Sequence, residues 1–149
     1  MATEKSFTRQ ARINAPRDAV WSFMTNLENA PKWIPGVSET RQTSQGPMGT
    51  GAVIRETRTI GKRTETYDIK VSAFEPPKRY AAAAQAGKAE FEYTYELAEA
   101  GGSTDITMKA TARGKGLITK MFISVGMRFM EKIDGDQLER LKKTVEEST

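Results

Sequence analysis

The chain has 149 residues, of which 38% are hydrophobic and 28% are charged, and its formal net charge is +4. These values are typical of one soluble globular domain over residues 1–149, and no run approaches the ~18–20 apolar residues that a membrane-spanning helix needs. The sequence contains neither histidine nor cysteine, which excludes disulfides, thiolate nucleophiles, Ser-His-Asp triads and the usual zinc sites.

The missing histidine also weighs against catalysis, because proton transfer would fall to Asp, Glu, Lys or Tyr, whose ordinary pKa values lie far from neutrality. We therefore expect no metal and no cofactor, and we lean towards a protein that is not an enzyme. The basic residues are scattered, so nucleic-acid binding is not expected, although the net charge is compatible with weak contact to an anionic membrane surface. Because the first ten residues lack the apolar segment of a secretory signal, we expect a cytoplasmic protein.

The first elements are a strand and a helical pair. Residues 6–14 alternate apolar and polar side chains, which predicts a half-buried strand. The period then changes, and an apolar stripe at helical spacing predicts a helix over residues 15–30. Two prolines and a glycine bracket Trp33 in "NAPKWIPGV", which indicates a short second helix or a turn.

Residues 37–113 carry the punctuation of an antiparallel meander, because "QGPMGTG", "GKR", "EPP", "GK" and "AGGS" all predict turns. The strands predicted between them cover residues 37–44, 52–60, 64–74, 79–86, 89–99 and 104–112. Alternation is clearest over 89–99, where Phe91, Tyr93 and Tyr95 share one face.

From about Lys115 the pattern is helical to the end of the chain. The main apolar stripe, which we expect to face the interior, consists of Ile118, Met121, Phe122, Val125, Phe129 and Ile133. After Gly135 the apolar positions shift to Leu138, Leu141 and Val145, so we expect a bend near Gly126 or Gly135. One strand, two short helices, six more strands and this helix predict an α+β domain in which a curved antiparallel sheet wraps around the C-terminal helix.

Two features suggest that such a sheet is not completely filled. The run "AAAA" at 81–84 places small side chains on both faces of one strand. Methionines at 121, 127 and 130 supply adaptable side chains on the facing helix. Together these residues favour a partly hollow interior.

Five motifs occur in an order that resembles a known superfamily: "INAPRDAVWSFMTNLENAPKWIPGV", "GPMGTGA", "FEPPKRY", "GGSTDIT" and "LERLKKTVEE". They are similar to the START-related helix-grip (SRPBCC) superfamily, and most of all to its polyketide cyclase/dehydrase-like branch. The resemblance spans essentially the whole chain. It implies a seven-stranded sheet gripping the last helix around an apolar tunnel, with the two short helices closing one end. The loop that holds Trp33 would form part of the rim.

Such a tunnel has candidate lining residues of three kinds: apolar side chains, tyrosines and one charged pair. They are Phe23, Trp33, Ile54, Glu56, Arg58, Tyr67, Ile69, Phe91, Tyr93, Tyr95, Met108, Met121, Phe122, Val125 and Phe129. Inward tyrosine hydroxyls would hydrogen-bond a carbonyl or hydroxyl of a ligand. The resemblance places Glu56 and Arg58 inward, where they could orient a polar head. The alternatives are that the aromatic residues only pack the core and that Glu56 and Arg58 belong to a solvated strand face.

The preferred function is binding or transport of a small hydrophobic molecule, such as a lipid, an isoprenoid or an aromatic polyketide-like metabolite. The alternative is a polyketide cyclase or dehydratase that moves protons with Tyr, Arg or Glu. A third class is an interaction module that presents Leu138, Leu141 and Val145 to a partner. The chain would act as a monomer or a homodimer.

Overall fold

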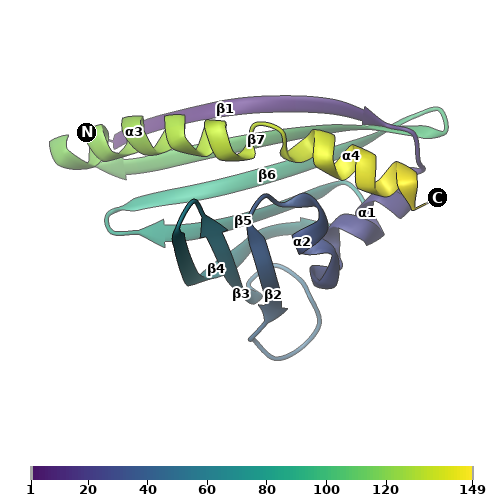
Figure 1. The fold of residues 1–149 in the computed structure, drawn as a ribbon, viewed down its shortest axis with the longest axis horizontal. Helices are drawn as coiled ribbons and strands as arrows, with labels where there is room; N and C mark the ends of the chain where they lie inside the picture. Colours follow the sequence, from purple (N-terminus) through teal and green to yellow (C-terminus); the bar gives the residue numbers. More distant parts are fainter. Residues whose placement is uncertain (1, 149) are drawn as a thin grey trace.

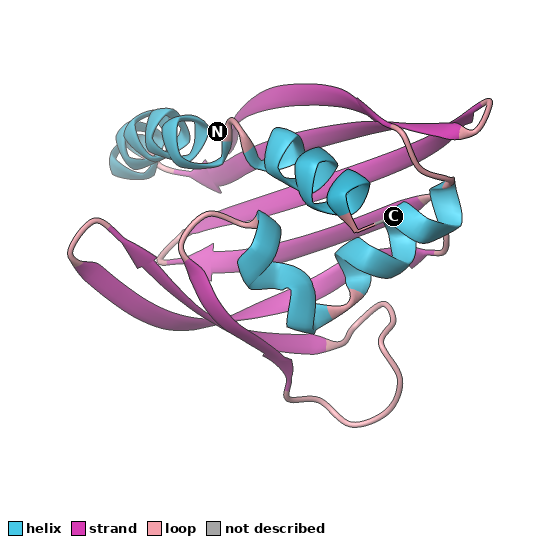
Figure 2. Cartoon of the chain, turned by 45° about the vertical axis from the view of Figure 1, so that its right-hand side comes forward, coloured by secondary structure: helices cyan, strands magenta, loops and turns pink. Residues whose placement is uncertain are grey.

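A computed structural model describes residues 2–148 and contains one antiparallel sheet with helices on its concave side (Figures 1 and 2). The strand order is β1-β7-β6-β5-β4-β3-β2. The strands are β1 (Ala2–Ile13), β2 (Val37–Gln42), β3 (Val53–Ile60), β4 (Arg63–Glu75), β5 (Arg79–Ala86), β6 (Ala89–Ala100) and β7 (Ser103–Lys115). The helices are α1 (Arg17–Thr25), the 3-10 turn η1 (Leu27–Asn29), α2 (Ala30–Trp33), α3 (Leu117–Asp134) and α4 (Gln137–Glu147). This arrangement confirms the predicted α+β class and its seven-stranded curved sheet.

Curvature of the sheet comes from irregular pairing as well as from twist. The register shifts between Val37 and Glu39 where β2 pairs with β3, and between Val71 and Ala73 where β4 pairs with β5. Such irregularities bend a strand locally. As a result, β2 to β5 turn away from the long strands β1, β7 and β6 and leave a concave face between them (Figure 1).

The helical pair after β1 closes one end of this concave face. Pro16 directly precedes α1, and the acidic Asp18 lies in its first turn, as a helix start favours. Val20, Trp21 and Met24 are the buried residues of α1. The helix therefore seals the end of the sheet with its apolar side.

The C-terminal helical segment breaks at Gly135, one of the two predicted positions, and its two halves pack differently. The second half, α4, buries Leu138, Leu141 and Val145 and contacts β1 and α2. These three residues therefore pack inside the domain and are not available to bind a partner. The first half, α3, contacts β7 and β1 through its buried Ile123 and Met127.

The predicted inward orientation of the α3 stripe holds for Phe122, Phe129 and Ile133 and is wrong for the other three residues. Ile118, Met121 and Val125 have exposed fractions of 84%, 68% and 70%. The helix has apolar residues on two opposite faces, and the face carrying Ile123 and Met127 is the one that packs. The helix lies along the β1–β7 side of the sheet (Figure 2). The exposed fractions show that the side of Ile118, Met121 and Val125 points away from the sheet. Among the described residues, no helix is long and apolar enough to cross a membrane.

Candidate ligand cavity

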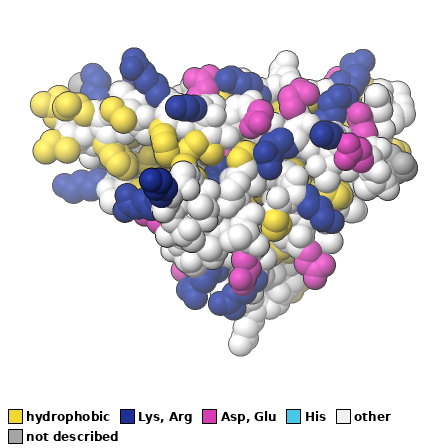
Figure 3. Space-filling model, viewed as in Figure 1, with side chains coloured by type: hydrophobic (Ala, Val, Ile, Leu, Met, Phe, Trp, Pro, Cys, Tyr) yellow, Lys and Arg dark blue, Asp and Glu magenta, His cyan; other side chains and the backbone are white. Residues whose placement is uncertain are grey.

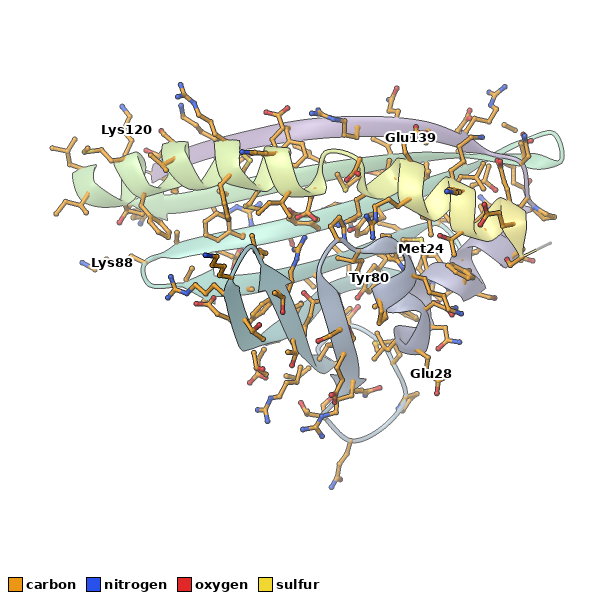
Figure 4. The ribbon with its side chains drawn as sticks, viewed as in Figure 1. Met24, Glu28, Tyr80, Lys88, Lys120 and Glu139 are labelled. Atoms are coloured by element: carbon orange, nitrogen blue, oxygen red, sulfur yellow. The ribbon has the colours of Figure 1, made fainter. Side chains whose placement is uncertain are left out.

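A cavity of about 450 Å³ lies between the concave face of the sheet and the helices. Its walls come from β2, β3, β4, β5 and β6 on one side and from α1, η1, α2, α3 and the start of α4 on the other. Met24 and Tyr80 lie at the end that α1 covers (Figure 4). Pockets for small organic ligands typically measure roughly 300–1,000 Å³, so the size suits such a molecule.

Most of the residues predicted to reach a cavity lie on this wall. They are Trp33, Ile54, Glu56, Arg58, Tyr67, Ile69, Phe91, Tyr93, Tyr95, Phe122 and Phe129. Glu56 and Arg58 therefore face inward, and the solvated-face alternative does not hold for them. Trp33 is 2% exposed and meets Tyr95 edge-on, with ring centroids 5.7 Å apart, so it is both packed core and cavity wall.

The structure corrects the prediction for four others. Phe23 is half-buried on the flank of α1, with the Lys32 ammonium 6.0 Å from its ring, while Met24 takes the cavity position. Met108 is fully buried inside the core of the sheet. Met121 and Val125 lie on the exposed face of α3, because the packed face of that helix is the opposite one.

Small side chains keep the interior hollow. Ala82 and Ala84, from the predicted small-residue strand, line the cavity. Gly126 of α3 faces the ring of Phe91, since a Cβ on this glycine would lie 3.5 Å from the Phe91 Cζ atom. Larger side chains at these three positions would occupy the space that the sheet encloses.

A carboxyl and a phenol form the first polar group in the cavity. Glu56 and Tyr67 are register partners on β3 and β4, and the Tyr67 hydroxyl donates to Glu56 Oε2 at 2.5 Å. Burial raises the pKa of Glu56, and it outweighs the opposing effects of the Tyr67 hydrogen bond and of the Arg58 charge. The pKa of Tyr67 is also raised, by burial and by the neighbouring carboxylate. Glu56 therefore holds a proton at a higher pH than an exposed glutamate does.

A buried ion pair forms the second polar group, where β3 meets the junction of α3 and α4. Arg58 donates through Nη2 to Asp134 Oδ1 at 2.5 Å and through Nη1 to Asp134 Oδ2 at 3.3 Å. Its Nε donates to the Pro35 carbonyl at 2.8 Å, which fastens the loop after Trp33. Burial alone would lower the pKa of Arg58, but the hydrogen bonds and charge of Asp134 raise it, so the guanidinium stays charged.

Tyrosines and an amide complete this group. The Tyr93 hydroxyl donates to Asp134 Oδ2, and the Gln137 amide donates to Asp134 Oδ1 at 3.2 Å. The Tyr95 hydroxyl donates in turn to Gln137 Oε1. Burial raises the pKa of both tyrosines, so they remain neutral donors. The members of this group hydrogen-bond to one another, and they join strands β3 and β6 to both halves of the C-terminal segment.

Two further polar atoms near the cavity have no partner. Within residues 2–148, the buried side-chain atoms without a hydrogen bond include Trp33 Nε1 and Thr40 Oγ1, and both residues line the cavity. Buried polar groups are usually paired, so unpaired ones on a cavity wall are compatible with a site that receives polar atoms from outside. In the described part of the chain no cluster of acidic residues could hold a metal ion.

Sequence reasoning missed Tyr80, Asp134 and Gln137, all of which line the cavity. Tyr80 stacks on Tyr95, with ring centroids 6.1 Å apart. It was missed because it lies near the start of a strand, shortly after a proline pair, where the alternation of apolar and polar residues does not yet show which face a side chain takes. The available signal for Asp134 was a carboxylate that ends an apolar helix directly before a glycine. Its partner Arg58 is distant in sequence, so only the fold brings the two together.

Comparison with known proteins agrees with this geometry. The family model described as "Polyketide cyclase / dehydrase and lipid transport" matches residues 4–146. No curated protein sequence matches the chain. Similar solved structures include the Zhui aromatase/cyclase from Streptomyces sp. R1128, with 12% identity, a TM-score of 0.78 and coverage of 97% of this chain and 94% of that one.

Two further solved structures extend the comparison. A norcoclaurine synthase point mutant from Thalictrum flavum, in complex with a transition-state analogue, has 15% identity and a TM-score of 0.74, and 99% of this chain and 98% of that one are covered. Ara h 8.0201 has 16% identity and a TM-score of 0.72, with coverage of 96% and 98%. At these identities the likeness shows the fold alone.

Proposed function

Because the chain belongs to the polyketide cyclase/dehydrase and lipid transport family, we propose that it binds and carries a small hydrophobic molecule in this cavity. The observation that carries the proposal is a space of about 450 Å³ with a largely apolar wall and polar groups gathered at few places. Apolar surface removed from water supplies the affinity, and the polar groups orient the ligand.

The charges in the cavity favour a ligand with a neutral polar group. The guanidinium of Arg58 is already engaged by Asp134 and by the Pro35 carbonyl, so it offers no free cation to a carboxylate. Glu56 adds either a proton donor or a negative charge. A hydroxyl or carbonyl group suits these partners better than an anionic head does. An isoprenoid alcohol or an aromatic polyketide-like metabolite therefore fits better than a fatty acid.

Binding is tested with the neutral fluorescent probe N-phenyl-1-naphthylamine. We expect Ala82→Phe to weaken probe binding by roughly tenfold or more, because the new ring fills the space that a ligand occupies. Ala83→Phe is the matched control, since residue 83 points to the opposite face of the same strand. Equal binding by wild type and Ala82→Phe, or an equal loss in both variants, would contradict a ligand in this cavity.

Head-group preference is tested with two competitors that share one hydrocarbon body, farnesol and farnesoic acid. We expect farnesol to displace the probe roughly tenfold better at a pH where the acid is ionised, a difference of about 1.4 kcal/mol. Farnesoic acid displacing the probe equally well would refute the neutral-ligand argument while leaving cavity binding intact.

The second candidate is a cyclase or dehydratase, which the raised pKa of Glu56 favours. A carboxyl that keeps its proton inside an apolar cavity can give it to a carbonyl oxygen or a leaving hydroxyl, with Tyr67 in hydrogen-bond contact. Glu56→Gln keeps the shape and removes the transferable proton. Turnover of a polyketide-like substrate that is lost in this variant, with binding unchanged, would support the enzyme. Unchanged turnover would exclude Glu56 as the acid.

A further inference from the structure

The outer face of α3 exposes an unusual amount of apolar surface. Every large hydrophobic residue in the described chain that stands out as exposed belongs to this helix. We call these residues the α3 apolar face: Leu117, Ile118, Met121, Phe122, Val125 and Phe129. They form the yellow area at the left end of the molecule in Figure 3. Monomeric soluble proteins rarely expose contiguous apolar patches larger than roughly a few hundred Å². A larger exposed patch marks an interaction surface.

Positive charges accompany this face. Residues 117–130 contain no Asp or Glu, and their charged side chains are Lys120 and Arg128. Lys88 is at the same end of the molecule, because its carbonyl lies 3.0 Å from where a Cβ on Gly114 would be (Figure 4). Lys115, the last residue of β7 and two residues before the helix, is also exposed. The acidic Glu131 in the next turn is paired with Arg9 at 2.7 Å.

The α3 apolar face continues into the cavity. Phe122 and Phe129 are 50% and 52% exposed and also belong to the cavity wall. Across from them, Ile60 and Glu65 line the cavity on either side of the turn that carries the exposed Lys62. A surface that covers the outer face of α3 would therefore also meet the cavity at its opening.

We propose that the α3 apolar face docks on a lipid bilayer that contains anionic lipids, with the helix lying in the plane of the interface. An 18-residue helix is about 27 Å long, and an apolar face with basic residues beside it is typical of interfacial helices. Docking would bring the cavity opening to the membrane, where a hydrophobic ligand passes between bilayer and protein without crossing water.

Charge argues for a bilayer over a second copy of the chain. A two-fold pairing of α3 faces would bring Lys120 and Arg128 of one protomer near the same residues of the other, and like charges oppose such contact. Anionic head groups would instead neutralise these residues, at about 1 kcal/mol for each Lys or Arg near the surface. The apolar side chains between them would enter the head-group layer.

The test is co-sedimentation of the full chain with vesicles of phosphatidylcholine mixed with phosphatidylglycerol, and with vesicles of phosphatidylcholine alone. We expect binding to the mixed vesicles that weakens with added salt, and much weaker binding to the neutral ones. The variant Ile118→Ser/Met121→Ser/Val125→Ser should lose binding, while its cavity still takes the neutral probe, since none of the three residues lines the cavity.

A charge-reversal pair separates local from general electrostatics. Lys120→Glu/Arg128→Glu should weaken vesicle binding by roughly tenfold or more. Lys70→Glu/Lys109→Glu changes the net charge equally on exposed strand positions and should have a much smaller effect. Absence of binding to mixed vesicles, or equal loss in both pairs, would overturn the proposal. So would a wild-type dimer, detected by light scattering, that the serine variant converts to a monomer. None of these results would contradict ligand binding in the cavity, because the fluorescent-probe assay measures that binding without vesicles.

Discussion

Asp134→Ala removes the acceptor at the centre of the buried network. Asp134 accepts two hydrogen bonds from Arg58 and one each from Tyr93 and Gln137. The exposed fractions of the Arg58 and Asp134 side chains are 12% and 2%, so water solvates the remaining guanidinium far less than it would at an exposed site. Breaking a buried pair while one charge stays behind costs about 3–5 kcal/mol. At roughly 2–4 °C per kcal/mol for a chain of this size, we expect Tm to fall by roughly 6–20 °C.

A matched control is the exposed pair of Arg12 and Asp105. Its geometry is just as good, with hydrogen bonds of 2.7 and 2.9 Å, but the side chains are 64% and 48% exposed. Asp105→Ala should therefore leave Tm nearly unchanged, because water solvates the remaining arginine. Comparable losses in the two variants would show that burial does not set the strength of these pairs and would refute the reasoning.

Urea unfolding and calorimetry measure both variants, and a double variant separates charge from packing. Arg58→Met/Asp134→Leu replaces the pair by apolar side chains of similar size. Such replacements are often neutral or stabilising, so the double variant should recover most of the stability that Asp134→Ala loses. A double variant as unstable as Asp134→Ala would indicate that the hydrogen bonds matter beyond the stranded charge.

Three further predictions concern the pH dependence, one turn and the C-terminal helices. Burial raises the pKa of Glu56 in the folded state above its ordinary value of about 4.5. The stability that protonated Glu56 contributes is therefore present in acid and is lost as the pH rises from about 4.5 through the raised pKa of the folded state. Glu56→Gln should abolish this fall, so urea midpoints should match wild type in acid and exceed it at neutral pH; the reverse order would contradict burial as the cause. Gly36→Ala should cost more than about 1 kcal/mol in urea unfolding, because φ is +78° and a Cβ would lie 2.2 Å from the Thr59 carbonyl oxygen. Leu141→Ala, at a fully buried site, should lose about 2–5 kcal/mol, whereas Ile118→Ala should stay within about 0.5 kcal/mol; similar losses would mean that α3 packs like α4.

Local patterns predicted the strands and the inward face well. Phe91, Tyr93 and Tyr95 alternate with glutamates and a threonine, and a period of two leaves one choice of face once the sheet is half-buried. Glu56 and Arg58 break the apolar pattern of their strand, so their inward placement depended on the family likeness rather than on periodicity. The hollow at Ala82 and Ala84 followed from side-chain size alone.

Contacts between elements that are distant in the sequence could not be predicted from such local patterns. The α3 segment is apolar on two faces, and its sequence does not say whether the side of Ile123 or the side of Val125 meets the sheet. The pairing of Asp134 with Arg58 likewise depends on where the helix break places the carboxylate. Periodicity describes one element at a time, whereas these features belong to contacts between elements.

Tryptophan placement has a practical consequence. The chain holds only two tryptophans, and Trp33 lies on the cavity wall while Trp21 packs nearby against Phe74 outside it. Intrinsic tryptophan fluorescence would therefore report whether the cavity is occupied. A ligand would contact the Trp33 indole, whereas the Trp21 indole would serve as an internal reference. Trp33→Phe and Trp21→Phe separate the two contributions without attaching any dye.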